Sequence, residues 1–256
     1  KVLVEYQTEG WNWIRAGAAL GNGFIADRGV MAFEWAFARM SDNENSTRES
    51  GSFGESKTIE ITHFLGLYAR SVLLLRAAKL EERAKRLERL APRLEVSLRS
   101  SRSLLGERRW DRAEKKINMT YQRIQAAAAA YWIGRLLANP SLRKTADIWL
   151  DEALKRQDIN GSFPSDLPIK SRAASRAQLE ALDALQGLAF ADIRYALKLR
   201  EPISRGFRWF DLTKTPLAGS PITVATFAAW TKNPAASKQA QLMVKRFGAI
   251  RASSKK

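Results

Sequence analysis

Apolar side chains recur at helical spacing along most of this chain. In residues 11–40 they are interrupted by Gly21, Asn22 and Gly23, which predicts two helices joined by a short turn. Residues 57–80 repeat the pattern at i, i+3, i+4 and i+7, the stripe of a helix that is buried on one face. We therefore expect three helices in the first third of the chain.

Polar segments follow each of these predicted helices. Residues 41–56 are rich in Gly and Ser, and we expect a long loop there. Residues 81–90 carry Glu and Arg at three- and four-residue spacing, which indicates a solvated helical face supported by ion pairs. Pro92 marks a break or the start of another helix.

The second half of the chain predicts further helices. Residues 119–139 include five consecutive alanines and end before Pro140, which suits the first turn of a helix over 140–157. The side chains expected to face inward on that helix are Ala146, Ile148, Trp149, Leu150 and Leu154. Turn residues fill 160–168, and a long helix is predicted over 171–199.

Few residues alternate in the pattern of a β-strand. The best candidate strand is the short stretch 207–210, and the tail over 223–252 predicts two shorter helices split at Asn233 and Pro234. No run of about eighteen apolar residues occurs, so we expect no membrane span. The predicted fold is all-α, built from antiparallel helix pairs joined by short turns.

Charge narrows the range of partners. The 256 residues include 43 Lys and Arg against 26 Asp and Glu, a net charge of +17. This surplus favours an anionic partner: nucleic acid, an anionic membrane surface or an acidic polysaccharide. The absence of cysteine excludes a disulfide framework and a Cys-ligated zinc site. With one histidine and no Gly-rich phosphate loop, we expect no cofactor.

Two segments carry the functional interpretation: INMTYQRIQAAAAAYW at 117–132 and QDINGSFPSDLPIKSRAASR at 157–176. Together they resemble the alginate-lyase-like polysaccharide lyases, whose fold is an incomplete (α/α) toroid of antiparallel helix pairs. Members of that family carry an Asn-Asn-His-x-Tyr-Trp stretch. After a helical hairpin they carry a turn of the form Asp-Gly-Ser-Leu-Pro-x-Glu-Leu, and then a basic stretch with Arg and Tyr.

The resemblance is carried by individual residues. Asn118 and Tyr121 match the first motif. The second motif is matched by Gly161, Ser162, Pro164, Asp166, Leu167, Arg172 and Ala173. This sequence differs from the family at positions that the family uses for catalysis. Met119 stands at the His position, Arg176 or a neighbour stands at the Tyr position, and Ile169 stands at an Arg position.

The resemblance implies metal-independent β-elimination on a uronate-containing polysaccharide. That reaction needs a group to neutralise the C5 carboxylate, a base for the C5 proton and an acid for the leaving oxygen. We expect Asn118 and Arg172 to hold the carboxylate and Tyr121 to transfer the proton, and Arg176 completes the predicted catalytic set. The predicted substrate-binding residues are Lys116, Gln122, Arg123, Lys170, Trp13 and His63. Packing in the core is the alternative role for Tyr121, Trp13 and His63.

Three functional hypotheses stay open. The first is a lyase that cleaves an alginate- or glucuronan-like polymer. The second keeps the fold and the ligand without the reaction: a catalytically degenerate protein that binds an anionic exopolysaccharide. The third, a nucleic-acid-binding helical protein, has only the charge in its favour, because no base-reading motif is present.

The resemblance also implies organisation and location. It predicts a single helical domain over residues 1–256, with the question of a missing N-terminal segment left open. It places the protein in the periplasm or outside the cell, in contact with an anionic polysaccharide. The sequence does not predict the oligomeric state.

Overall fold

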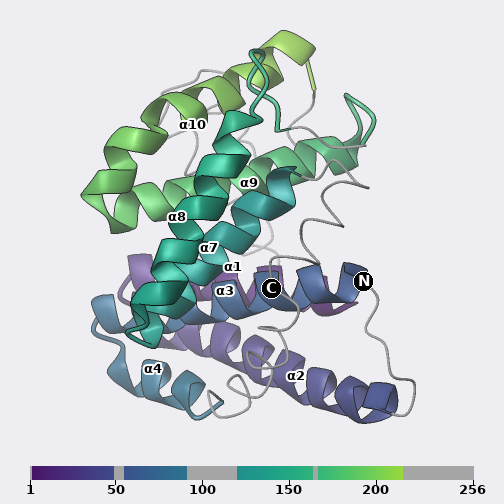
Figure 1. Cartoon of the computed structure of the whole chain (residues 1–256). Coiled ribbons are helices and arrows are strands. Elements are labelled where there is room, and N and C mark those ends of the chain that lie inside the picture. Colours follow the sequence, from purple (N-terminus) through teal and green to yellow (C-terminus); the bar gives the residue numbers. More distant parts are fainter. Residues whose placement is uncertain (1, 49–54, 91–119, 164–166, 216–256) are drawn as a thin grey trace, which may run out of the picture. The chain divides into compact units, whose positions relative to one another are not determined.

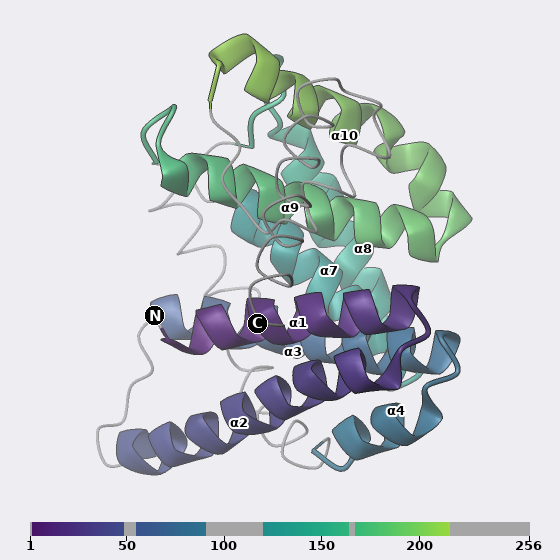
Figure 2. The same cartoon turned by 180° about the vertical axis from the view of Figure 1, so that it is seen from behind.

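In the computed structural model of the protein, the regular secondary structure of the described residues is entirely helical (Figures 1 and 2). The structure describes residues 2–48, 55–90, 120–163 and 167–215. These residues form eight helices and contain no strand, which confirms the predicted all-α class for the described part of the chain. The chain forms two compact units, residues 1–155 and 156–256. That the two form one domain, as the sequence predicts, stays a prediction.

The first two helices form the predicted hairpin. Helix α1 spans Val2–Ala19 and helix α2 spans Gly23–Arg48, and the two pack along each other. The turn between them uses Gly21 in a left-handed conformation, with φ of 59°. Asn22 caps the second helix, because its Oδ1 accepts a hydrogen bond from the Ile25 amide at 3.2 Å.

Backbone contact between α1 and α2 depends on glycine. A Cβ atom added to Gly29 would lie 2.5 Å from the carbonyl oxygen of Gly10. A Cβ added to Gly17 would lie 2.5 Å from the amide nitrogen of Ala26. No side chain fits at these points, so the hairpin is held at the closest approach that two helices allow.

An aromatic cluster joins this hairpin to helix α3, Glu55–Ala77. The ring of Phe37 meets those of Phe64 and Tyr68 edge-on, with centroids 4.8 and 5.2 Å away. Tyr68 is fully buried, and its hydroxyl donates a hydrogen bond to the carbonyl of Leu87 beyond the end of α3. Burial raises the pKa of this phenol well above its ordinary value.

Helix α4, Glu81–Glu88, is attached to its neighbours by ion pairs rather than through a wide apolar face. Arg83 and Arg86 each contact one carboxylate of α2 through two nitrogens, Asp27 at 3.0 and 3.1 Å and Glu34 at 2.6 and 2.7 Å. The carboxylates raise the pKa of both guanidinium groups. The ion pairs predicted for this helical face are confirmed. Most of the residues that pair with α4 lie on other helices and not within α4 itself.

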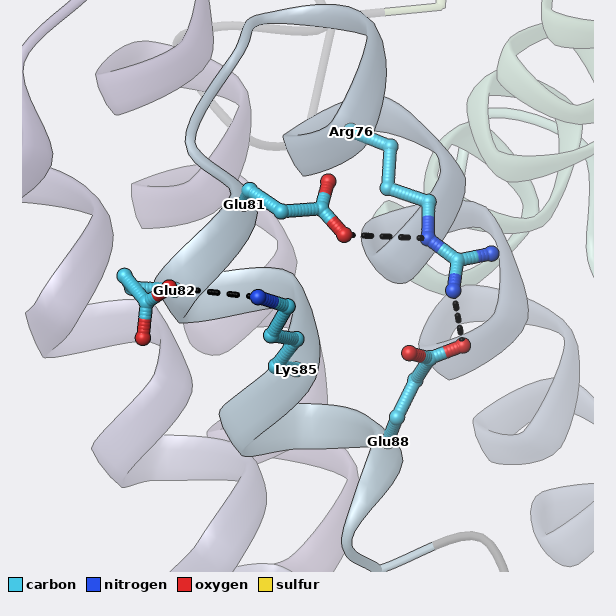
Figure 3. Close-up of polar contacts among 5 residues, drawn as sticks. All are labelled: Arg76, Glu81, Glu82, Lys85 and Glu88. Carbon is cyan, nitrogen blue, oxygen red and sulfur yellow. Dashed lines mark hydrogen bonds and ion pairs between the residues drawn. The ribbon is translucent and has the colours of Figure 1, made fainter.

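Figure 3 shows the corner where α3 turns into α4. Arg76, in the last turn of α3, contacts Glu88 at 2.5 Å and Glu81 at 4.0 Å. Its guanidinium therefore bridges the two ends of α4. Within α4, Lys85 contacts Glu82 at 3.4 Å, and these exposed side chains contribute little to stability.

A second hairpin completes the described part of this unit. Helix α7 spans Thr120–Leu136 and helix α8 spans Pro140–Lys155, and Asn139 caps α8 through its Oδ1. Both helices and the place of Pro140 are as predicted. The five alanines of α7 are buried, and a Cβ added to Gly66 of α3 would lie 2.6 Å from the Cβ of Ala129.

The other unit contains helices α9, Arg172–Ala191, and α10, Ile193–Thr213. They pack on each other, and a buried amide cluster ties the preceding turn to both. Gln178 of α9 donates hydrogen bonds at 3.0 Å to the carbonyls of Gly161 and Gly206 and accepts one from the Phe163 amide. One side chain thus links the 160–163 turn, α9 and α10.

Gly161 sits at the tightest point of that cluster. Its φ is +91°, and an added Cβ would lie 1.9 Å from the carbonyl oxygen of Arg205. Gln157 also donates to the Gly161 carbonyl at 3.1 Å and to the Pro202 carbonyl at 2.8 Å. The 160–163 turn is therefore built against the backbone of α10.

Three predicted boundaries are wrong. The loop expected over 41–56 is helical up to Arg48 and again from Glu55, because polar residues alone do not end a helix and the first glycine is Gly51. The helix expected over 171–199 ends at Ala191, because the next residue, Asp192, has an extended backbone and its side chain caps α10.

The predicted strand over 207–210 and one predicted inward side chain are also wrong. Residues 207–210 lie inside α10, where Ile203, Phe207 and Phe210 recur at helical spacing and are buried. On α8, Ile148 is 48% exposed, whereas Trp149 and Leu150 are buried as predicted. The predicted helices over 223–252 lie outside the described residues.

None of the helices among the described residues is both long enough and apolar enough to cross a bilayer.

Replacing Tyr68 with Phe should lower the free energy of unfolding by about 1 to 2 kcal/mol, because the buried Leu87 carbonyl loses its donor. Ser71→Ala is the control, since the Ser71 hydroxyl only returns to Leu67 within its own helix. The raised pKa predicts that stability falls as pH rises above about 10, where only the unfolded phenol ionises. Denaturant titrations should show that this part of the alkaline loss is absent from Tyr68→Phe. An identical alkaline loss in both proteins would contradict the burial argument.

Replacing Gly161 with Ala should cost about 3 kcal/mol or more, because the new Cβ meets a backbone oxygen and the residue keeps a positive φ. Gly21→Ala is the matched control. It shares the positive φ but has nothing within 4 Å of the new Cβ, so about 1 kcal/mol is expected. Equal losses of unfolding free energy in the two variants would show that the close contact with α10 does not matter.

Candidate polyanion-binding site

The clearest grouping of predicted site residues is at the N-terminus of α9. Ser171 caps the helix, and its side chain accepts a hydrogen bond from the Ala174 amide at 3.0 Å. Lys170 precedes the cap and Arg172 follows it, and both side chains are exposed. Arg176 is exposed one turn further along α9. Three of the predicted residues therefore lie along one short stretch of backbone.

The charge at this helix end has the unfavourable sign for stability. The N-terminus of a helix carries a partial positive charge, and acidic side chains usually occupy its first turn. The first turn of α9 has no acidic residue and begins with Arg172. A bound anion offsets both the helix dipole and the arginine charge, and backbone amides at such an end are suited to bind it.

Lys170 adds a conformational cost at the same place. Its φ is +69°, in the left-handed region that favours glycine. Lys79 and Lys214 also have positive φ, but they follow the C-termini of α3 and α10, where a cation is favourable. Lys170 lies at an N-terminus, where neither the backbone nor the dipole favours it. A lysine that is unfavourable for the fold at this position supports a role for it in binding.

Arg176 is already engaged within its helix. Its Nε contacts the Glu180 carboxylate at 2.8 Å, and its side chain is 45% exposed. An exposed pair of this kind is weak, so an anion of higher charge can compete with Glu180. Its predicted role at the position of the family Tyr stays a prediction.

The other predicted group lies at the start of α7. Tyr121 and Gln122 are half-buried, and the Gln122 side-chain amide donates a hydrogen bond to the Tyr121 hydroxyl at 3.2 Å. Lys116 and Asn118 lie outside the described residues. Tyr121 belongs to one unit and Arg172 to the other, so their predicted common site stays a prediction.

Arg123 has an internal role in this structure. It is 4% exposed, its Cζ lies 4.9 Å from the centre of the Trp149 ring, and its guanidinium pairs with Glu152 on α8. These contacts join α7 to α8. A part in substrate binding requires the half-exposed Glu152 side chain to give way, and it stays a prediction.

The predicted aromatic and histidine contacts are distributed along unit 1. Trp13 is half-buried, with Arg28 over its ring at 5.3 Å and its Nε1 donating to Glu9 at 3.3 Å. His63 lies within α3. Trp11 and Trp132 are 4% and 8% exposed, so they belong to the core and do not offer a flat face to a sugar ring.

The sequence analysis did not identify the residues that hold the 160–163 turn in place. Gln157 and Gln178 bond the backbone of that turn, but a lone glutamine on a helix gives no recognisable signal. The only sequence signal for this turn was the resemblance of Gly161 and Ser162 to the turn of the lyase family. In the part of the chain that the structure describes, no three acidic or histidine side chains gather as metal ligands.

Replacing Lys170 with Gly should separate stability from binding. We expect the melting temperature to rise, because about 1 kcal/mol of left-handed strain is removed. Affinity for an acidic polysaccharide should fall about three- to tenfold, the effect of losing roughly 1 kcal/mol of charge interaction. Ala138→Gly, at φ of 51°, is the control: it should stabilise equally and leave affinity unchanged. Unchanged affinity in Lys170→Gly would remove Lys170 from the site.

Comparisons of this chain with models of known protein families, with curated proteins and with solved structures give no match. The resemblance to alginate-lyase-like proteins therefore stays a prediction from the residues.

Proposed function

We propose that this chain binds an acidic, uronate-containing polysaccharide and cleaves it by metal-independent β-elimination. The observation that carries the proposal is the cationic N-terminus of α9, where Lys170 and Arg172 are exposed at a helix end that already favours anions. This end directly follows the turn around Gly161 that resembles the lyase motif.

Several features support a polysaccharide over other polyanions. The charge of +17 is accompanied by helical hairpins and by the two motif segments in the order that the lyase family has them. Helix pairs α1/α2, α7/α8 and α9/α10 are the kind of unit from which an (α/α) toroid is built. We propose the incomplete toroid as the arrangement of the whole chain, in the periplasm or outside the cell.

In the proposed reaction, Arg172 and Asn118 neutralise the C5 carboxylate of a uronate residue. Neutralising that charge makes the C5 proton more acidic, so a weak base can remove it. Tyr121 then transfers the proton, with the Gln122 amide holding its hydroxyl at 3.2 Å. The C4–O4 bond breaks, the leaving oxygen takes up a proton, and a C4–C5 double bond remains in the product.

Binding without cleavage is the second candidate function. Met119 stands where the family has its histidine, and Arg176 stands near the place of its tyrosine. Methionine cannot move a proton, and Arg176 is held by Glu180 and does not deprotonate in proteins. In this form the protein holds or escorts an anionic exopolysaccharide, and Arg172 and Lys170 keep the same roles.

An absorbance screen near 235 nm tests the reaction, because β-elimination creates an unsaturated uronate. The panel is alginate, polymannuronate, polyguluronate, glucuronan, hyaluronan and heparinoid chains. For a lyase we expect a rise with at least one polymer, and a loss of about a hundredfold or more in rate for Tyr121→Phe and for Asn118→Ala.

The matched control for these variants is Tyr131→Phe, a buried tyrosine two helical turns or more beyond Tyr121 on α7. A flat trace with every polymer, together with measurable binding, would establish the second candidate and rule out the lyase. A flat trace and no binding to any acidic chain would overturn the proposed ligand class itself.

A further inference from the structure

The hairpin of α1 and α2 carries an exposed arginine beside two aromatic rings. The Cζ atom of Arg28 lies 5.3 Å from the centre of the Trp13 ring and 5.9 Å from the centre of the Phe24 ring. Both distances are within the range of cation–π attraction. Phe24 and Arg28 are about one turn apart on α2, and Trp13 approaches them from α1. The hairpin therefore brings one cation and two aromatic rings together.

The backbones that carry these three side chains cannot slide past each other. A Cβ atom added to Gly17, one turn beyond Trp13, would lie 2.5 Å from the amide nitrogen of Ala26. Ala26 is two residues from Phe24 and two residues from Arg28. Because the two helices touch at this point, the three side chains start from fixed positions on one rigid hairpin.

Apolar side chains adjoin Arg28 on both sides along α2. Phe24, one turn before it, is 72% exposed, and Met31, about one turn after it, is also exposed. Leu20, just before the turn of the hairpin, is exposed as well. The Phe24 ring therefore offers much of its surface to the solvent. Exposed apolar side chains that gather around a charged one are typical of a binding surface.

The hydrogen-bond donors of Arg28 are not used by the described part of the chain. Its contacts there are the two rings, which attract the charge of the guanidinium group and accept no conventional hydrogen bond. The neighbouring carboxylate of Asp27 is held by Arg83 through both oxygens. Glu9 accepts a hydrogen bond from the indole of Trp13. Arg28 thus keeps a planar set of donors that suits a carboxylate of a ligand.

This combination matches the two parts of a uronate residue. A uronate has an apolar face of C–H groups, which can lie on an aromatic ring, and a carboxylate on the same sugar ring. Phe24 presents the ring and Arg28 the paired donors, about one helical turn apart. Holding the guanidinium group near two rings also removes rotamer freedom before binding, which lowers the entropy cost of recognition.

A single-stranded nucleic acid also uses aromatic rings and cations. Proteins that bind it without sequence preference offer several stacking rings along a groove lined with cations. Here one exposed ring is paired with one arginine, and the carboxylates of Glu9 and Asp27 lie close by in the hairpin. The arrangement therefore favours recognition of one acidic sugar residue over binding of a phosphate backbone.

We infer that Phe24 and Arg28, with Trp13 supporting the arginine, form a subsite on unit 1 that binds one uronate residue. The choice of uronate rests on the proposed function, but the subsite is defined by residues of its own. These residues are separate from Lys170 and Arg172 of unit 2, so each group can be tested without changing the other.

The experiment follows the Arg28 Nε–H signal by NMR, with Arg28→Met used to assign it. The protein is titrated with sodium glucuronate, with sodium acetate and with glucose, and sodium chloride keeps the ionic strength constant. Acetate has the carboxylate without the sugar ring, and glucose has the ring without the carboxylate. We expect saturation with glucuronate, about tenfold weaker binding of acetate, and no saturation with glucose.

Three variants test the parts of the subsite. Phe24→Leu keeps an apolar side chain and loses the flat ring, so glucuronate should bind it about as weakly as acetate does. Met31→Ala is the matched control: it removes an exposed apolar side chain from the same helix and should leave the preference for glucuronate unchanged. Arg28→Lys keeps the charge and loses the planar donors, and several-fold weaker binding is expected at the Trp13 indole N–H signal.

The remaining outcomes separate the subsite from the proposed function. Equal affinity of glucuronate and acetate in the unaltered protein would show that the ring takes no part, and would overturn the subsite. Saturation at the Arg172 Nε–H signal without any at Arg28 would overturn it as well and leave the proposed function standing. A Phe24-dependent affinity for uridine monophosphate above that for glucuronate would assign this face to nucleic acid. Saturation at neither arginine would count against both proposals.

Discussion

Close approach of helices at glycine and alanine is the constraint on which the rest of this structure depends. Gly29 meets Gly10, Gly66 meets Ala129, and Gly161 meets the carbonyl of Arg205, each at a distance that admits no added side chain. Where two backbones touch, the neighbouring large side chains have one available position. The aromatic cluster around Phe37 and the contact of Arg70 with the Trp11 ring lie on the same helices as these contacts.

The acidic residues and the surplus cations have different structural roles. On α4, Arg83 and Arg86 are neutralised by carboxylates of α2, and Arg76 bridges Glu81 and Glu88, so these charges hold helices together. At the N-terminus of α9, Lys170 and Arg172 are exposed and have the wrong sign for the helix dipole. Cationic side chains that lower the stability of this helix end are better explained by binding of an anionic ligand than by a role in the fold.

Much of the helical architecture was predictable from periodicity. The hairpin around Gly21, the alanine-rich α7 and the start of α8 at Pro140 follow from local rules of spacing and capping. The errors occurred where local preference opposes tertiary packing. Aromatic residues at 207–210 favour a strand in isolation, yet they face the core from a helix.

The candidate site was predictable only in part. Lys170, Arg172 and Arg176 were found through the lyase-like motif, because they are close in sequence. The strain at Lys170 was not, since nothing in the sequence marks a lysine with positive φ. The contact of Arg70 with the Trp11 ring was not predictable either, because the two residues lie on different helices and only the packing of α3 against α1 brings them together.

The central claim is that cations held in fixed positions on this protein bind an acidic polysaccharide. It is tested most directly by titrating the protein with alginate and with neutral dextran at rising sodium chloride concentration. The account predicts no binding to dextran and an affinity for alginate that falls at least about tenfold between about 0.05 and 0.2 M salt. Equal binding of the two polymers, or an alginate affinity that salt does not change, would contradict it.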